Sequence, residues 1–179
     1  NVTTRQGYAL TETSPVAYYT PHGAERDGKV GVLAPGTECR IVDVDTGQDA
    51  LAGQPGEVWI RGPQVMKGYL NNPEATAATV DGDGWLHTGD IGTVDDEGYL
   101  TVVDRLKELI KVKGFQVAPA ELESLLMAHP QIADVAVIPV ADDEAGEVPK
   151  AFVVSRGTLT GAEVIAFIHS QVAHYKRLR

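Results

Sequence analysis

Residues 98–123, GYLTVVDRLKELIKVKGFQVAPAELE, contain the change of pattern that decides the fold of this chain. Residues 99–103 are rich in β-branched side chains and predict a strand. Residues 109–112 predict another strand, and residues 119–129 predict an amphipathic helix with its leucines on one face. The charged segment 104–107 separates the two patterns. We therefore expect a domain boundary in this segment, which is suited to act as a hinge.

The C-terminal side of this boundary predicts a small lobe of mixed helices and strands. Lys and Gly at residues 113–114 predict a turn, and apolar runs predict strands at residues 134–140 and 151–155. Thr160 and Glu163 form a capping box that opens a second helix. The expected order is therefore β-α-β-β-α. The residues expected to pack this lobe are Leu122, Leu125, Leu126, Val135, Val137 and Ile138, with Val164, Ile168 and Val172 along the second helix.

The N-terminal side predicts mostly β-structure. Residues 28–62 alternate apolar and polar positions and are interrupted by Pro-Gly and Thr-Gly turns. Residues 71–80 predict a short helix, because an Asn can cap it and a Pro suits its first position. Residues 84–104 predict a hairpin that turns at residues 95–98, Asp-Asp-Glu-Gly.

Composition limits the function classes. The 179 residues are 43% apolar, which suffices for one ordinary domain or two small ones. The net charge of −10 argues against nucleic acid or an anionic membrane as the main partner, because both favour a basic face. No apolar run reaches the length of a transmembrane helix. The single cysteine, Cys39, is expected to be a small buried apolar residue, and a reducing, cytoplasmic compartment is expected.

Several common sites are excluded by the absence of their motifs. The chain has no G-x-G-x-x-G after a strand, no complete phosphate-binding P-loop and no G-x-S-x-G elbow. Its five histidines lack metal-ligand spacing. Residues 81–84, DGDG, suggest a calcium loop, but Trp85 and Gly92 occupy positions where ligands are required. We therefore expect tight turns there.

Three stretches carry candidate chemistry, and the first is GYALTETSP, residues 7–15. It is too polar for a buried strand and too rich in Thr and Ser for a helix interior. Tyr8 can stack on a flat heterocycle. Thr11 can bond a phosphate or acyl oxygen, and Glu12 can hold Mg²⁺ beside a nucleotide. Taken alone, the stretch favours a plainer alternative, a loop with a Thr/Ser turn network and a solvated acid.

The second stretch is WLHTGD, residues 85–90. A carboxylate that follows a glycine turn, as Asp90 does, can accept hydrogen bonds from the two vicinal hydroxyls of a ribose. The alternative is a hairpin in which Asp90 is a local turn cap.

The third stretch places four cations within nine residues of an otherwise acidic chain, namely Arg105, Lys107, Lys111 and Lys113. The three lysines have mostly odd-even strand spacing, so they can share one face of a strand. Such a stripe at a domain joint can meet phosphates or a phosphorylated cofactor. The alternative is a solvated, salt-bridged edge.

Together these stretches resemble one family. GYALTETSP, GEVWIRGPQVMKGYLNNPEAT, DGWLHTGDIG and residues 98–123 occur in an order that resembles the acyl-adenylate-forming superfamily, over nearly the whole chain. Within it they most resemble acyl-CoA ligases of the 4-coumarate–CoA ligase type, with luciferase as a near relative. The resemblance implies that a carboxylic acid and ATP give an acyl-adenylate and pyrophosphate, after which coenzyme A displaces AMP.

The resemblance also implies a domain organisation that mixes α/β and α+β structure. Residues 1–104 would be the C-terminal part of a large ATP- and acyl-binding domain, ending in a β-barrel-like subdomain. Residues 105–107 would be the hinge, with Lys107 at the position where the family has it. Residues 108–179 would be a truncated, small and mobile α+β lid domain.

Site residues of the N-terminal part follow from the matching motif positions. Tyr8 would stack on adenine, Thr11 would contact the phosphate, and Glu12 would bind Mg²⁺. Asp90 would hold the ribose hydroxyls, assisted by Arg105. The residues that would border the acyl pocket are Gly7, Pro15 and Val16.

Site residues of the C-terminal part come from the third stretch. Lys111 and Gln116 would approach AMP or the acyl-adenylate and, with Thr11 and Glu12, would form the catalytic set. Lys113 and Gly114 would lie near the path of the pantetheine arm of coenzyme A.

Two family segments are absent from the sequence. A Ser/Thr/Gly-rich phosphate loop would precede this stretch, and the main catalytic lysine would follow Arg179. With Asn1 opening the chain in place of a methionine, we expect an interior piece of a longer protein that is inactive alone. Arylpropenoic acids such as 4-coumarate are the favoured substrates. The alternatives are medium- or long-chain fatty acids, the loading of a carrier-protein thiol, a luciferase, or a non-catalytic nucleotide-binding module.

Overall fold

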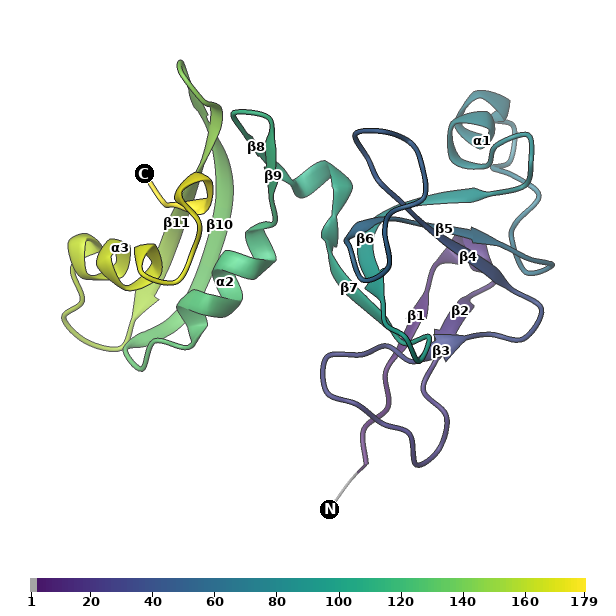
Figure 1. The fold of residues 1–179 in the computed structure, drawn as a ribbon, viewed down its shortest axis with the longest axis horizontal. Coiled ribbons are helices and arrows are strands. Elements are labelled where there is room, and N and C mark those ends of the chain that lie inside the picture. The colour runs from purple at the N-terminus through teal and green to yellow at the C-terminus, as the bar shows by residue number, and fades with distance from the viewer. Residues whose placement is uncertain (1–2) are drawn as a thin grey trace. The chain divides into compact units, whose positions relative to one another are not determined.

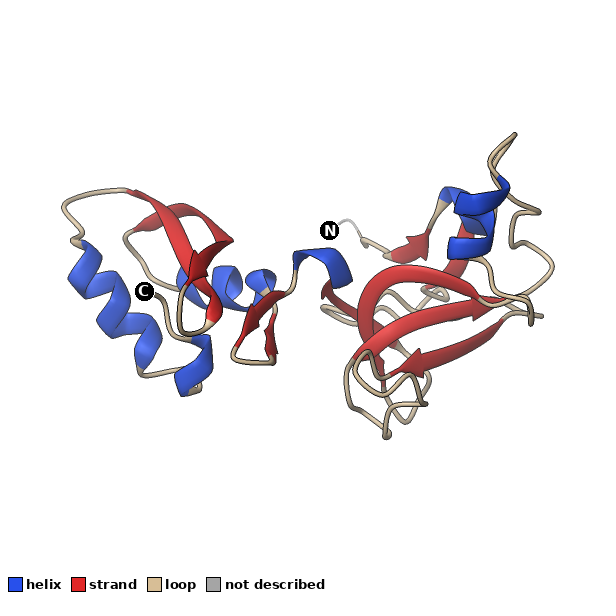
Figure 2. Ribbon diagram, turned by 90° about the horizontal axis from the view of Figure 1, so that it is seen from above, coloured by secondary structure: helices blue, strands red, loops and turns tan. Residues whose placement is uncertain are grey.

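The computed structural model describes residues 3–179, which form two compact units that meet in sequence between Val103 and Asp104 (Figure 1). Three sheets and a few short helices make up this described part of the chain (Figure 2). The mixed fold expected from the sequence is confirmed. None of the helices in the described residues has the length and apolar character needed to cross a bilayer.

The first unit contains two sheets. One has the order β1-β2-β3, and the other is a meander with the order β4-β5-β6-β7. Hydrogen bonds from Val30 N to Leu100 O and from Leu100 N to Gly31 O join the first sheet to β7. The strands are β1 (Gly7–Ala9), β2 (Val16–Tyr19), β3 (Val32–Leu33), β4 (Glu38–Val42), β5 (Gly56–Arg61), β6 (Leu86–Val94) and β7 (Leu100–Arg105).

The alternation of side chains along β5 builds the core of this unit. Val58 and Ile60 are fully buried, while Glu57 and Trp59 point to the opposite face, as a period of two residues requires. Cys39 is half-buried beside the same core. The buried residues of the core are Tyr8, Ala17, Tyr18, Val58, Ile60, Leu86 and Leu100.

The expected hairpin and short helix are confirmed. The β6–β7 turn closes with a bond from Gly98 N to Asp95 O. Helix α1 (Pro73–Thr79) is capped by Asn72, whose side chain accepts a hydrogen bond from Ala75 N. The expected tight turns at residues 81–84 are confirmed as well, since Asp81 Oδ1 accepts from two later backbone amides.

The expectation for residues 7–15 was partly wrong, because Gly7–Ala9 is a strand. Tyr8 alone points inward in this strand, and its two neighbours are small and exposed. The polarity of residues 7–15 as a whole therefore gave no sign of a strand. Thr11–Thr13 forms a 3₁₀ turn.

The second unit has one four-stranded sheet of order β10-β11-β8-β9. Its two helices lie on one side of the long β10–β11 hairpin, as Figure 2 shows, and their buried side chains share one core with the sheet. The elements are β8 (Ile110–Val112), β9 (Phe115–Val117), α2 (Pro119–Met127), β10 (Ile132–Asp142), β11 (Gly146–Ser155) and α3 (Gly161–His169). Short 3₁₀ turns occur at Leu106–Glu108 and His174–Lys176.

Three expectations for this unit were wrong. The order is β-β-α-β-β-α, because the three-residue strand β9 was missed. Ile138 is 43% exposed and points away from the core, since its neighbour Val137 points inward and β10 alternates. Val172 packs against the core but lies beyond the end of α3, which stops at His169.

The N-terminus of α2 is stabilised by a residue distant in sequence. Ala118 precedes the helix and has no side chain that can cap it. Instead, Asp104 Oδ2 accepts a hydrogen bond from Ala120 N at 3.1 Å, and Asp104 Oδ1 accepts one from Arg105 N at 2.7 Å. The charged segment that marks the boundary is thereby fixed to the first turn of α2.

We predict that Leu126→Ala lowers the free energy of unfolding of the second unit by about 2–5 kcal/mol, because it leaves a cavity in a fully buried site. The matched control Ile138→Ala should cost less than about 1 kcal/mol, because its side chain faces solvent. Urea unfolding measures both. Equal losses would contradict the assigned direction of β10.

We also predict that the first unit loses stability above about pH 10. Burial raises the pKa of Tyr18 far above its ordinary value of 10.0, so the unfolded chain releases a proton at a pH where the folded chain keeps it. The stabilising contribution is therefore complete below pH 10.0 and is lost as the pH rises. Urea unfolding between about pH 8 and about pH 11 should show this fall, and Tyr18→Phe should reduce its slope. A flat profile in the unmodified chain would contradict the prediction.

Candidate functional site

The structure brings together two of the predicted site residues, Tyr8 and Asp90. The Tyr8 hydroxyl donates a hydrogen bond of 2.6 Å to Asp90 Oδ2, although the residues are 82 positions apart. Tyr8 is 8% exposed and Asp90 is 7% exposed. The Tyr8 ring also meets Tyr18 edge-on, with ring centroids 6.5 Å apart. The bond therefore fixes β1 to β6 inside the first unit.

The protonation state of Tyr8 suits this bond. Burial, and then the hydrogen bond to Asp90, raise the pKa of the Tyr8 hydroxyl far above its ordinary value. The hydroxyl therefore remains a donor across the neutral range. The bond to Tyr8 holds the orientation of the Asp90 carboxylate.

A bulge in β6 sets the position of Asp90. The β5–β6 register pairs Glu57 with Ile91, but Trp59 with His87, so Val58 lies opposite three residues of β6. An insertion of this kind bends a strand and redirects a side chain. Here it turns the buried Asp90 toward Tyr8.

Thr88 and Gly89 hold the bulge in shape. Thr88 Oγ1 donates to Val58 O at 2.7 Å and accepts from Asp90 N at 3.1 Å. Gly89 has a φ of +71°, a left-handed conformation that favours glycine. Sequence reasoning identified Asp90 but missed the role of Thr88, whose signal is a hydroxyl two residues before the acid.

The expected phosphate and metal residues lie on the 3₁₀ turn that follows β1. Thr11 is exposed, and Glu12 is half-buried with its Oε1 accepting a hydrogen bond from the Tyr69 hydroxyl at 2.7 Å. Met66 N donates to Glu12 O at 2.8 Å. Sequence reasoning missed Tyr69, which lies in the loop before α1 and orients the Glu12 carboxylate.

The turn network proposed as the plainer alternative for this loop also exists. The fully buried Thr13 accepts from Leu10 N at 3.1 Å and donates to Pro15 O at 2.5 Å. The network supports the turn that carries Thr11 and Glu12. A structural and a functional interpretation of the stretch are therefore compatible.

The expected acyl-pocket residues lie at the ends of β1 and β2. Gly7, Pro15 and Val16 are all exposed in this chain. A Cβ atom added to Gly7 would lie 3.2 Å from Tyr18 O, so a larger residue would crowd the adjacent strand. Their contact with an acyl group stays a prediction.

In the second unit the structure pairs Lys111 with Gln116. They are directly opposite each other in the β8–β9 hairpin, so their side chains leave the same face. Lys111 N donates to Glu147 Oε2 at 2.8 Å, and its side chain is exposed.

The predicted turn at Lys113 and Gly114 is confirmed as the tip of this hairpin. Both residues have positive φ angles, +49° and +84°, as a two-residue type I′ hairpin turn requires. The expected stripe of three lysines was wrong, because β8 ends at Val112 and Lys107 lies in a 3₁₀ turn. Only Lys111 of the three lies on a strand.

Arg105 belongs to the second unit and Asp90 to the first. Their expected cooperation at a ribose therefore stays a prediction, and so does the role of the exposed Lys107 as a hinge residue.

Two hollows occur in the second unit. A groove of about 280 Å³ adjoins the hairpin tip, where Phe115 and Tyr175 stack with ring centroids 4.4 Å apart. Its other lining residues are Val112, Lys113, Val148, His174, Arg177 and Arg179.

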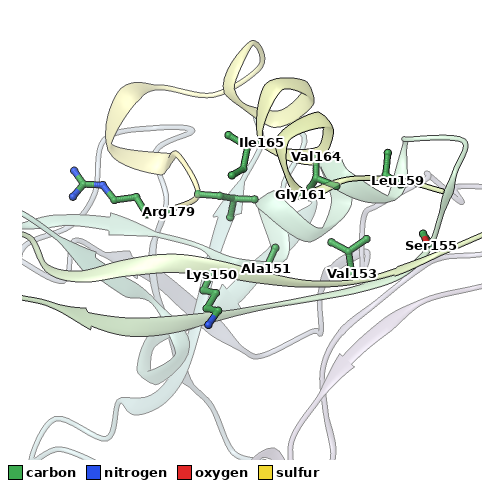
Figure 3. Close-up of a pocket in the computed structure, with 10 residues that line it drawn as sticks. Lys150, Ala151, Val153, Ser155, Leu159, Gly161, Val164, Ile165 and Arg179 are labelled. Carbon is green, nitrogen blue, oxygen red and sulfur yellow. The ribbon is translucent and has the colours of Figure 1, made fainter. Parts of the chain in front are cut away.

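The second hollow, of about 310 Å³, lies between β11 and α3 and has mainly aliphatic walls, including Ala151, Val153 and Val164 (Figure 3). None of the predicted site residues lines it.

Within residues 3–179, no three or more His, Cys, Asp or Glu side chains gather in a way that could hold a metal ion. A metal ion held by Glu12 would therefore have at most two such ligands from these residues. That is compatible with Mg²⁺ bound to a nucleotide, since this ion commonly takes one or two carboxylates together with phosphate and water oxygens.

Comparison with known proteins gives consistent relatives. The AMP-binding enzyme family matches residues 2–70, and the AMP-binding enzyme C-terminal domain matches residues 121–179. The chain is 56% identical to 4-coumarate–CoA ligase 2 of Oryza sativa subsp. japonica over 180 residues, covering 97% of this chain and 32% of that protein. It thus spans about a third of the length of the curated relatives it matches.

Solved structures agree with the sequence relatives. ATP-bound MatB from Rhodopseudomonas palustris matches 98% of this chain and 35% of its own, with a TM-score of 0.92 and 35% identity. The o-succinylbenzoate CoA synthetase of Bacillus subtilis, in complex with its acyl-adenylate intermediate, matches 96% of this chain and 35% of its own, with a TM-score of 0.83 and 34% identity. From its motifs, its fold and these matches, the chain belongs to the AMP-binding enzyme family, the acyl-adenylate-forming enzymes.

Proposed function

We propose that this chain is part of an ATP-dependent acyl-CoA ligase that acts on an arylpropenoic acid of the 4-coumarate type. Relatives named as 4-coumarate–CoA ligases are 53–56% identical to it, and the AMP-binding family matches both of its ends. Because the chain spans about a third of those relatives, the complete reaction belongs to the longer polypeptide of which these residues would be a part.

The buried hydrogen bond between Tyr8 and Asp90 is the observation that carries this proposal. A stable sheet does not require a buried carboxylate there, because burial of a charge is costly unless its partners compensate. The bond would keep Asp90 in a fixed orientation toward two neighbouring hydroxyls. Ribose presents that pair, and Tyr8 would place the adenine against its ring.

The 3₁₀ turn would receive the phosphates. Thr11 would donate its hydroxyl to the α-phosphate, and Glu12, oriented by Tyr69, would hold the Mg²⁺ that accompanies ATP. The ion would neutralise phosphate charge. The acid would lie beside Gly7, Pro15 and Val16, so that its carboxylate reaches the α-phosphorus. Catalysis would then depend mainly on positioning and charge neutralisation.

The second unit would serve both half-reactions. Lys111 and Gln116 point from one face of a rigid hairpin, and would hydrogen-bond AMP or the acyl-adenylate. Lys107 would be the hinge residue, and Arg105 would assist Asp90 at the ribose. A lid of this kind excludes water and orients the second substrate.

Coenzyme A would follow the hairpin tip at Lys113 and Gly114. The groove beside the tip supports this proposal, because it combines the stacked Phe115 and Tyr175 rings with cationic side chains. Aromatic faces and cations suit a nucleotide carrying phosphates. A cytoplasmic location is part of the same proposal, since coenzyme A and ATP are used there.

The polypeptide that contains this chain should catalyse acid-dependent exchange of pyrophosphate into ATP. We expect exchange with cinnamic-type acids to exceed that with benzoic or fatty acids, and added coenzyme A to yield the thioester. Preference for a fatty acid would replace the proposed substrate class. Absence of exchange with every acid, despite bound ATP, would contradict the ligase and favour a nucleotide-binding module.

Asp90→Ala should raise the KM for ATP by about 100-fold, because a charge-assisted contact to two hydroxyls is lost. Tyr8→Phe keeps the ring and removes only the hydroxyl, so its effect should be smaller, about tenfold. Steady-state kinetics of pyrophosphate exchange gives both values, and circular dichroism checks that the variants fold. An unchanged KM in Asp90→Ala would contradict the assignment of Asp90 to the ribose.

A further inference from the structure

The bulge that carries Asp90 has a third support besides Thr88 and Tyr8, and it comes from the neighbouring strand. Glu57 of β5 extends its carboxylate across the bulge, and its Oε1 accepts a hydrogen bond from Gly89 N at 2.9 Å. Its Oε2 accepts one from Trp59 Nε1 at 2.7 Å. The two carboxylate oxygens thus bind groups on two strands, Oε1 the bulge of β6 and Oε2 the Trp59 side chain of β5.

The geometry of β5 explains why Glu57 can reach both groups. Glu57 and Trp59 share the face opposite the buried Val58. The Trp59 ring is itself held, because it stacks on His87 with centroids 3.8 Å apart and planes 13° apart. His87 lies directly before the bulge, so the indole is a fixed anchor for the carboxylate.

The bulge needs this support because an inserted segment loses its strand partners. The Asp90 amide is satisfied by Thr88, and the Gly89 amide is satisfied by Glu57. Removing Glu57 would leave the Gly89 amide without this partner, next to the buried carboxylate. An unsatisfied amide of this kind shifts until it finds water or another acceptor.

We propose that Glu57 is a positioning residue for nucleotide binding, which acts by fixing the Gly89 peptide and through it the carboxylate of Asp90. The inference rests on the proposed contact between Asp90 and ribose. Glu57 itself would touch no substrate. The proposal thus assigns a residue that affects nucleotide specificity to β5, a strand from which none of the proposed ligand contacts comes.

A merely structural role for Glu57 would make a different prediction. Glu38 of β4 is the matched control, because its carboxylate also makes two side-chain hydrogen bonds, both to Arg61, on the adjacent strand of the same sheet. Within the described residues, Glu38 makes no hydrogen bond to residues 88–90 of the bulge. Loss of a carboxylate from this sheet is common to Glu57→Ala and Glu38→Ala, whereas loss of positioning should alter the Asp90 and Gly89 signals only in the first.

The first test is spectroscopic and uses the 179-residue chain. Carbon-13 NMR of the Asp90 carboxyl and the amide exchange rate of Gly89 should both change in Glu57→Ala and remain unchanged in Glu38→Ala. Glu57→Gln, which keeps one acceptor oxygen, should show an intermediate effect. Unchanged Asp90 and Gly89 signals in Glu57→Ala would overturn the inference whatever the activity of the longer protein.

The second test measures pyrophosphate exchange in the polypeptide that contains this chain. Glu57→Ala should raise the KM for ATP about tenfold with a smaller change in kcat, and Glu57→Gln should recover part of the loss. In an Asp90→Ala background, Glu57→Ala should add less than about twofold, because coupled residues are not additive.

The outcomes separate the two proposals. An impaired Asp90→Ala beside an unimpaired Glu57→Ala contradicts the positioning role alone. If the double variant raises the KM for ATP by the product of the two single effects, the positioning role is also contradicted, because Glu57 would then act independently of Asp90. An unimpaired Asp90→Ala contradicts the ribose contact, and with it the functional part of this inference.

Discussion

The first unit depends on one constraint, the fixed orientation of a buried carboxylate. Asp90 lies in a bulge of β6 and accepts a hydrogen bond from Tyr8 of β1. A buried charge without partners is costly, so the groups around it must be held in place as well. Thr88 binds the Asp90 amide, Glu57 binds the Gly89 amide, and a glycine supplies the left-handed backbone. This set of contacts is the reason for the proposal that Asp90 faces a ligand.

The second unit presents its polar groups in a different way, from a short hairpin. Two residues with positive φ close the turn, and the register places Lys111 opposite Gln116. The aliphatic core beneath it, from α2, α3 and the β10–β11 hairpin, supplies stability and leaves the hairpin face polar. Asp104 caps α2 from the segment that links the units, so a hydrogen bond to the first turn of α2 fixes this segment on the C-terminal side of the boundary. Both units thus hold the proposed site residues on backbone that is fixed by local hydrogen bonds.

Sequence patterns predicted the elements whose signals are local. The capped helix at α1, the β6–β7 turn and the Thr160 capping box each depend on neighbouring residues, and all are present. Motif order also indicated Tyr8 and Asp90 as site residues, although no local pattern could show that they touch across 82 positions. The bulge was not predictable, because it exists only as a mismatch between β5 and β6. Glu57 and Tyr69 were missed for the same reason, since each acts on a segment distant in sequence. Ile138 was wrongly expected in the core, because an apolar residue type does not show which face of a strand the residue occupies.

Recognition of the two ribose hydroxyls by Asp90 is the proposal on which the other assignments depend. Its most direct test compares ATP with 2′,3′-dideoxy-ATP as substrates for acid-dependent adenylation, in the unmodified polypeptide and in Asp90→Ala. The unmodified protein should prefer ATP by about 100-fold in kcat/KM, because a site built to bond hydroxyls rejects an analogue without them. The preference should fall below about threefold in Asp90→Ala, since the partner of those hydroxyls is gone. An equal preference for ATP in both proteins would contradict the claim.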